Sequence, residues 1–220
     1  MNTDFRIVEV MNASSYNDAE NLEKHFNRIA GLLMNRIVLI VNKNRYRLTE
    51  IEFYYYSTGY HEDPYIHRNK LQLLAGQWYF HGSGLDITFG DGTNYGGILI
   101  RGIKLINRDK PVFIDGPLNV VQEIFSAFGN VSYKEHTLTL IETDDLPVEE
   151  IVRSTRVGLK DKEPAGFKDK YYRYLTFPFE ASHDYKEKTR VAQLMLNGDK
   201  QLRSYSQEEI NAGFNWKVIK

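Results

Sequence analysis

The most informative segment of this chain is Arg47-Leu48-Thr49-Glu50-Ile51-Glu52-Phe53-Tyr54-Tyr55-Tyr56. It is rich in β-branched and aromatic residues, which predicts a β-strand. Because side chains alternate along a strand, one face is expected to carry Thr49, Ile51, Phe53 and Tyr55, and the other Leu48, Glu50, Glu52, Tyr54 and Tyr56. The first face suits a core. The second combines possible general bases with rings that stack on a base or sugar, although an exposed strand face with solvated glutamates is the alternative.

The composition is that of a soluble globular protein. The chain has 220 residues, 42% hydrophobic and 26% charged, which suits one domain or a domain with an appendage. No apolar run is long enough to cross a membrane, and the first residues lack the pattern of a signal peptide. With no cysteine in the chain, we predict a cytoplasmic protein without disulfides or thiolate metal sites.

Charge and histidine spacing narrow the possible partners. The formal net charge is −1, whereas proteins that grip a long nucleic acid are usually more basic. The six histidines show no zinc-binding spacing. We therefore predict neither a metal nor a cofactor, and composition argues mildly against duplex DNA as the partner.

The first half of the chain predicts a helix followed by a hairpin. A helix is expected over residues 17–34, with Asn17 as N-cap and an apolar stripe of Leu22, Phe26, Ile29 and Leu33. A buried strand over residues 36–41 and a turn at 42–44 lead back into the segment around Glu52, which predicts a β-hairpin.

The remaining elements follow in order along the chain. A polar loop at 57–70 contains His61 and His67. Further strands are expected at 77–81, 85–89, 98–105, 131–142, 154–159 and 171–177. A helix over 118–128 is expected to start at Gly116-Pro117 and to end at Gly129. Residues 1–180 are thus predicted to form an α+β domain, and residues 181–220 a helical extension with Val191, Leu194 and Met195 on one stripe.

Arg101 is unusual because alternation places it in a row with Leu99, Ile103 and Leu105. An arginine in an apolar row must be paired or must open onto a cleft. Glu50 or Glu52 could be its partner, whether the pair is purely structural or part of a site. Residues 153–173 carry a local net charge of +4, which fits either phosphate contacts or a solvated loop.

Residues 22–178 resemble the alkyladenine (3-methyladenine) DNA glycosylase family, whose members excise alkylated purines. The family strand Arg-Ile-Val-Glu-Thr-Glu-Ala-Tyr is similar to Arg47 through Tyr54. Its loop histidine and Arg-Asn pair are similar to His61 with Arg68-Asn69, and its aromatic strand is similar to residues 78–84.

Further matches follow in the same order. The family segment Leu-Leu-Arg-Ala is similar to residues 99–102, and its Gly-Pro helix start to Gly116-Pro117. Its Arg-Ile-Gly-Ile strand is similar to residues 156–159, and its closing Trp-Arg-Phe-Tyr to residues 172–175.

The resemblance implies a fold, an activity and a set of site residues. The fold would be α+β, with one curved, mostly antiparallel sheet and flanking helices. The activity would be base excision from damaged DNA by a monomer that flips the base out of the stack. Glu52 would activate water and Arg101 would fix the water or a phosphate. The substrate pocket would be lined by Tyr54, His61, Phe80, Glu50 and Trp78, and the nucleic acid would be bound by Arg68, Asn69, Arg156 and Arg173.

Two positions depart from the family pattern. The tyrosine that wedges into the duplex falls at Ser83, and the asparagine that screens purines falls near Gly90. Neither residue can perform that task. The alternatives are therefore a hydrolase of a smaller N-glycoside, such as a nucleoside or single-stranded nucleic acid, or a non-catalytic nucleic-acid-binding relative.

Overall fold

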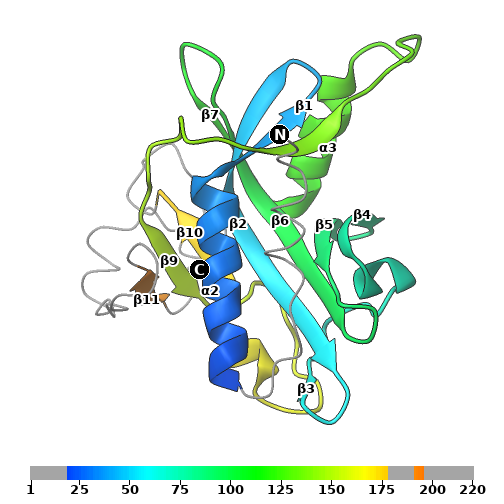
Figure 1. Ribbon diagram of the computed structural model, residues 1–220, viewed down its shortest axis with the longest axis vertical. Helices are drawn as coiled ribbons and strands as arrows, with labels where there is room; N and C mark the ends of the chain where they lie inside the picture. Colours follow the sequence, from blue (N-terminus) through cyan, green and yellow to red (C-terminus); the bar gives the residue numbers. More distant parts are fainter. Residues whose placement is uncertain (1–18, 178–190, 196–220) are drawn as a thin grey trace.

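The computed structural model describes residues 19–177 and 191–195, and these form one curved antiparallel sheet with two helices packed on it (Figure 1). The helices are α2 (Ala19–Asn35) and α3 (Pro117–Phe128), with short 3-10 turns η1 (Lys70–Leu73) and η2 (Phe167–Asp169). The strands are β1 (Ile37–Val41), β2 (Asn44–Ser57), β3 (His61–Glu62), β4 (Ala75–His81), β5 (Gly84–Phe89), β6 (Tyr95–Leu105), β7 (Val112–Asp115), β8 (Leu138–Glu142), β9 (Ile151–Ser154), β10 (Arg173–Thr176) and β11 (Val191–Met195). The predicted α+β fold with a single curved sheet is confirmed.

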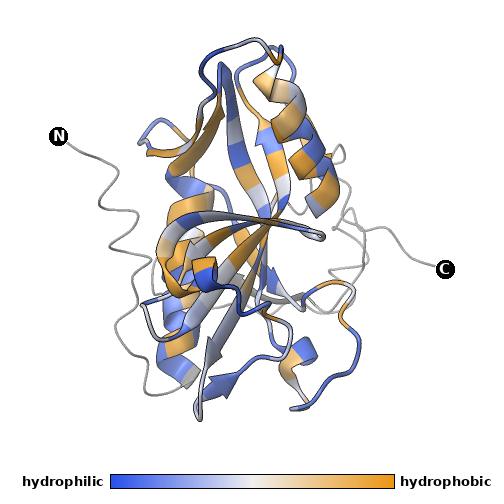
Figure 2. Cartoon of the chain, turned by 90° about the vertical axis from the view of Figure 1, so that its right-hand side faces the viewer, coloured by the Kyte–Doolittle hydropathy of each residue, from blue (hydrophilic) through white to orange (hydrophobic). Residues whose placement is uncertain are grey.

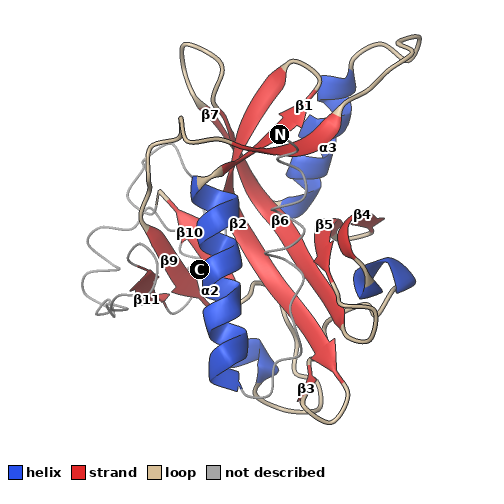
Figure 3. Cartoon of the chain, viewed as in Figure 1, coloured by secondary structure: helices blue, strands red, loops and turns tan. Residues whose placement is uncertain are grey.

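The long strand β2 lies at the centre of this sheet (Figure 3). The strand order along the main path is β11-β9-β10-β2-β6-β5-β4, and β1 pairs with β2 as the predicted hairpin. This strand has 14 residues and pairs with β1, β3, β6 and β10, so it holds the two halves of the sheet together.

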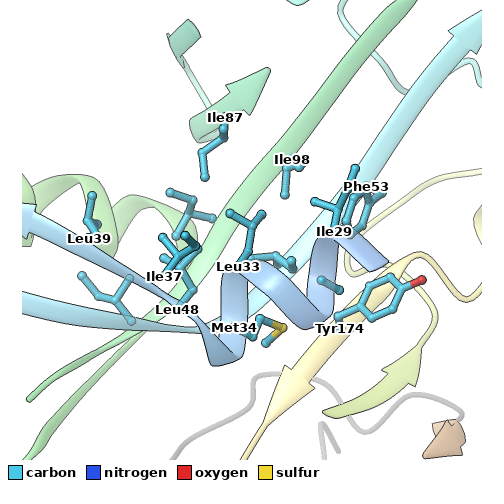
Figure 4. Packing of buried hydrophobic residues seen from close by; sticks show 14 of the residues in the cluster. Ile29, Leu33, Met34, Ile37, Leu39, Leu48, Phe53, Ile87, Ile98 and Tyr174 are labelled. Atoms are coloured by element: carbon cyan, nitrogen blue, oxygen red, sulfur yellow. The ribbon is translucent and has the colours of Figure 1, made fainter. Parts of the chain in front are cut away.

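Both helices cover the same face of the sheet, which we call the helix face. The predicted stripe of α2, Leu22, Phe26, Ile29 and Leu33, is fully buried. In Figure 4, Ile29 and Leu33 lie against the strands beside Phe53 and Leu48. Polar and apolar residues alternate along both helices in Figure 2, as expected for elements with one packed side.

The opposite face carries Glu52, Leu99 and Asp86, and we call it the carboxylate face. These three residues stand opposite one another on β2, β6 and β5. Their strand neighbours Phe53 and Ile98 belong to the hydrophobic core on the helix face. The expected alternation between a core face and a carboxylate-bearing face is thus present from Ile51 to Tyr56.

A bulge on β2 and a bulge on β6 change this alternation where the two strands pair. Leu48 pairs with Ile103, Glu50 with Gly102, and Ile51 with Ile100, so Thr49 is an extra residue on β2 and Arg101 is an extra residue on β6. A bulge of this kind re-aims the neighbouring side chains.

Two predicted rows of side chains are therefore wrong. Leu48 lies in the hydrophobic core and does not share a face with Glu50. Arg101 likewise does not share a face with Ile103 and Leu105, which are core residues.

Two strand predictions also need correction. The strand expected at 154–159 does not form: β9 ends at Ser154, because Val157 turns its amide toward Glu52 and Gly158 adopts a φ of 72°. Only residues 138–142 of the predicted 131–142 strand are extended.

Residues 191–195, expected to be helical, form β11, which pairs with β9. The open edge of β9 offers unpaired backbone groups, and pairing with them favours a strand over the helix that the short apolar pattern predicts. Asn17, predicted as the N-cap, lies outside the described part of the chain, as do residues 181–190 and 196–220. Neither helix in the described part is long and apolar enough to span a membrane.

Candidate active site

Glu50 lies at the centre of a buried ion-pair cluster. Its Oε1 accepts hydrogen bonds from Nε of Arg101 at 2.7 Å and from Nε of Arg173 at 2.8 Å. All three residues are buried. The prediction that Glu50 or Glu52 partners Arg101 is therefore confirmed. Two guanidinium groups on one carboxylate compensate part of the cost of removing these charges from water.

Glu52 is fully buried beside this cluster. Its Oε1 lies 3.4 Å from Nε of Arg101 and accepts a hydrogen bond from the backbone amide of Val157 at 2.7 Å. Its Oε2 accepts a hydrogen bond from the hydroxyl of Tyr54 at 2.7 Å. The structure thus brings together Glu50, Glu52, Tyr54 and Arg101, four of the residues predicted to form the site.

The electrostatic environment of the cluster is set by burial and by the two carboxylates. Burial works to lower the pKa of Arg101, but the charges of Glu52 and Glu50 outweigh it, so the pKa is raised. Burial, followed by the charge of Glu52, raises the pKa of the Tyr54 hydroxyl well above its usual value. Arg101 therefore stays charged and Tyr54 stays a hydrogen-bond donor near neutral pH.

Arg156 is also buried, and it anchors the segment that covers Glu52. Its guanidinium contacts both carboxylate oxygens of Asp63, at 2.5 and 3.3 Å, and donates to the carbonyl of Phe167 at 2.9 Å. It lies over the ring of Tyr54, 4.6 Å from the centroid. Arg156 and Arg173 were predicted to bind nucleic acid. Their side chains are instead fully buried in internal ion pairs, so neither is available at the surface.

His61 is held by two hydrogen bonds of its own. Its Nδ1 lies 2.9 Å from the carbonyl oxygen of Tyr55, and its Nε2 lies 2.9 Å from the hydroxyl of Tyr172. Burial lowers the pKa of the ring, so the neutral form donates from Nδ1 and accepts at Nε2. Both ring nitrogens are thus occupied by contacts within the protein, and the role of His61 in a substrate pocket stays a prediction.

Phe80 and Trp78 lie on the wrong face for that pocket. In β4, Trp78 stands opposite Ile87 and Phe80 opposite Leu85, and both of these partners are core residues on the helix face. The ring of Phe80 packs against Phe125 of α3, with centroids 5.7 Å apart. The prediction that these two rings share a pocket with Glu52 is therefore wrong, because strand alternation turns them to the other side of the sheet.

Arg68 and Asn69 remain at the surface loop where they were expected. Arg68 is exposed and its guanidinium lies over the ring of Tyr56, 4.8 Å from the centroid. Asn69 caps the short turn η1 by accepting a hydrogen bond from the amide of Leu71. Tyr56 follows Glu52 and Tyr54 on the carboxylate face, so Arg68 also lies over that face.

A polar group on the same face was not anticipated from sequence. Asp86, opposite Leu99, is buried and pairs with His81 at 2.9 Å, and Tyr79 stands opposite Asp86 in β4. The sequence does indicate this group, because the charged Asp86 lies between the apolar residues Leu85 and Ile87 in a predicted strand. Among the described residues there is no group of three or more acidic or histidine side chains that could hold a metal.

A cavity of about 360 Å³ lies elsewhere on the surface. Its lining is formed by Leu73, Leu74, Ala75, Gln77, Gly90, Asp91 and Gly92. Gly90, where the family resemblance places a screening asparagine, has no room for a side chain, because an added Cβ would lie 2.1 Å from the carbonyl oxygen of Gln72. The cavity is therefore bordered by backbone at this point and does not include Glu52.

No known protein-family profile matches the chain. The chain is 32% identical to "Uncharacterized protein L759" of Acanthamoeba polyphaga mimivirus, in an alignment that covers 78% of this chain and 94% of the viral protein. Identity at this level over nearly the whole of the viral protein indicates common descent. The chain belongs to the same family as the mimivirus protein L759.

Proposed function

We propose that the protein hydrolyses an N-glycosidic bond, with an alkylated purine in DNA as the substrate that its sequence resemblance favours. The observation that carries the proposal is the placement of Glu52 Oε1 at 3.4 Å from Nε of Arg101, with the Tyr54 hydroxyl on Oε2. This combines a carboxylate base, a fixed positive charge and an aromatic ring at one point of the sheet.

These groups match what such a reaction requires. Glu52 accepts a proton from water, the water oxygen forms a bond to the sugar carbon, and the carbon–nitrogen bond breaks with its electron pair moving to the base. The transition state has oxocarbenium character, which a nearby carboxylate stabilises. Arg101 would orient the water or contact a phosphate.

The hydrogen bonds that Glu52 already makes do not use its full capacity. A carboxylate offers about four acceptor positions, and the described contacts of Glu52 are the Val157 amide, the Tyr54 hydroxyl and Arg101. Tyr54 and Val157 are only partly buried, so they mark the side from which a water and a substrate would approach.

The direct test is base release by the full chain and by Glu52→Gln, which keeps the shape and removes the base. Substrates are alkylated duplex DNA, the same strand unpaired, and free alkylated nucleosides. Glu135→Gln, at an exposed position, is the matched control. We expect release by the wild-type and control proteins and a loss of at least about 100-fold in Glu52→Gln.

Equal release by the wild type and Glu52→Gln would remove Glu52 from the mechanism. If Glu52→Gln fails to fold, base release by Tyr54→Phe is measured instead, because this substitution deletes only the hydroxyl that donates to Glu52. Release confined to nucleosides would support the smaller N-glycoside as substrate.

A second candidate function is nucleic-acid binding without turnover. The complete burial of Glu52 and the orientation of Trp78 and Phe80 toward the helix face favour it. Binding of the oligonucleotides with no base release from any substrate would establish this function instead of the first.

A further inference from the structure

Four side chains form a cluster on the carboxylate face that the proposed reaction does not use: His67, Tyr79, His81 and Asp86. We call it the imidazole cluster. The rings of His67 and His81 are 4.5 Å apart and nearly perpendicular, and the ring of Tyr79 lies 5.0 Å from His81. The Tyr79 hydroxyl is 3.2 Å from Nδ1 of His67. Three polar rings therefore meet at one place.

A buried carboxylate, that of Asp86, fixes one ring of the cluster. Asp86 accepts hydrogen bonds from Nε2 of His81 at 2.9 Å and from the side-chain amide of Gln72 at 3.1 Å. The backbone amide of Ser83 donates to Nδ1 of His81 at 3.2 Å, which places the hydrogen of the neutral ring on Nε2. His81 is thereby held in one orientation, whereas His67 above it is exposed.

The cluster lies in the same cross-strand row as Glu52. Tyr79 stands opposite Asp86, Asp86 opposite Leu99, and Leu99 opposite Glu52. Strands in a sheet are about 4.8 Å apart, so the backbones of Tyr79 and Glu52 are roughly 14 Å apart along the sheet. A single base at Glu52 does not reach the cluster, so only a second, neighbouring nucleotide could occupy it.

Two cationic residues lie near the loop that carries His67. Arg68 follows it in the chain and lies over Tyr56 on the same face. Lys162 is close enough that its charge helps to lower the pKa of His67, after partial burial of the ring and the effect of His81. Lys162 also lies 5.2 Å from the ring centroid of Tyr65, in the loop that precedes His67. Aromatic rings between cations are the arrangement that binds single-stranded nucleic acid.

We infer that the imidazole cluster, with Arg68 and Lys162, binds a nucleotide that flanks the one at Glu52, with its base on the rings and its phosphate on the cations. The inference rests on the proposed function for the position of the reacting nucleotide. Contacts to flanking nucleotides are a common determinant of substrate choice in enzymes that act on an unstacked base.

The test is the affinity of the full chain for a fluorescently labelled single-stranded oligoadenylate, measured by anisotropy. The variants are His67→Ala and Tyr79→Leu. His136→Ala is the matched control, because His136 is also exposed but packs on Phe128, at the end of α3. We expect each cluster variant to weaken binding about tenfold, the effect of losing one stacked base, and the control to leave it unchanged.

Competition identifies the part of the ligand that is bound. Adenosine monophosphate is expected to displace the oligonucleotide, and inorganic phosphate at the same concentration is expected not to. Equal displacement by both, or equal affinity of His67→Ala and His136→Ala, would overturn the inference. His67 is exposed, so the test stands even if Tyr79→Leu does not fold.

Measuring base release by the wild type together with oligonucleotide binding by His67→Ala separates this inference from the proposed reaction. If the wild type releases base and His67→Ala binds normally, the cluster is not a nucleotide site and the reaction stands. If the wild type releases no base but binding depends on His67, the cluster is a nucleotide site and the reaction is refuted.

Discussion

The Nε atom of Arg101 lies 2.7 Å from Oε1 of Glu50, and a bulge on each of two strands makes this contact possible. Regular pairing would have kept Arg101 in the row of Ile103 and Leu105, in the hydrophobic core. Arg101 is itself the extra residue on β6 and so lies on the carboxylate face. The extra residue on β2, Thr49, places Glu50 on that face although Leu48 is in the core. Backbone irregularity is therefore the direct cause of the buried ion-pair cluster.

Gly102 is expected to be required for this pair of bulges. A Cβ at this position would lie 2.7 Å from Oγ1 of Thr49 and 3.1 Å from Cβ of Glu50. We predict that Gly102→Ala lowers the free energy of unfolding by about 1 to 3 kcal/mol through overpacking. Gly82→Ala, where a Cβ meets nothing within 4 Å, is expected to change it by less than about 0.5 kcal/mol. Urea unfolding of both variants measures the difference, and equal stability would contradict the prediction.

Glu50→Gln is expected to be strongly destabilising. The substitution leaves the buried guanidinium groups of Arg101 and Arg173 without the carboxylate that they share. Breaking a buried pair in this way typically costs about 3 to 5 kcal/mol. Glu135→Gln, at an exposed position, is the control for the same chemical change. A loss below about 1 kcal/mol in denaturant unfolding would mean that Glu50 is not the central partner of the two arginines.

Arg156→Lys tests whether the segment over Glu52 is fixed by a forked ion pair. Lysine keeps the charge but cannot contact both oxygens of Asp63 and the carbonyl of Phe167 in the same geometry. We predict a loss of about 1.5 to 3 kcal/mol in the free energy of unfolding. Arg45→Lys, at an exposed site, should be neutral. If both variants unfold at the same denaturant concentration, the fork contributes nothing beyond its charge.

The stability of the protein is expected to depend on pH through His61. Burial lowers the pKa of this ring in the folded protein, so the unfolded chain binds the proton more readily. The stability gained by keeping the ring neutral is complete above about pH 6.5 and is lost as the pH falls below that value.

The measurement is the free energy of unfolding at about pH 7.5 and pH 5.5. We expect a decrease toward the lower pH in the wild-type protein, and a smaller decrease in His61→Gln. His67, whose pKa is also lowered, contributes the same sign and accounts for part of the remaining slope. His136→Gln is the control. A slope in His61→Gln as steep as that of the wild type would show that His61 does not titrate on unfolding.

Local patterns in the sequence were enough to predict most helices and strands. The stripe of α2, the proline start and glycine end of α3, and the alternation of β2 all reflect contacts within a few residues of the chain. The partner of Arg101 was predicted for a similar reason, because a buried arginine requires an acidic neighbour and two were present on the adjacent strand.

The failures concern relations between segments. Phe80 and Trp78 were assigned to the site because they are aromatic and occupy a family-like strand, but pairing of β4 with β5 turns them to the helix face. The basic segment around Arg156 and Arg173 predicts surface charges, whereas their acidic partners, Asp63 and Glu50, lie about a hundred residues earlier in the chain.

The sequence by itself determined the amphipathic helices and the strand whose alternation points Glu52 and Tyr54 away from the core, and its family resemblance predicted one curved sheet with flanking helices. Only the tertiary structure decided which strands carry an extra residue, which face β4 presents and which arginines are buried. Hydrophobic periodicity is a property of a single segment, whereas register, bulges and ion pairs exist only after two distant segments have been brought into contact.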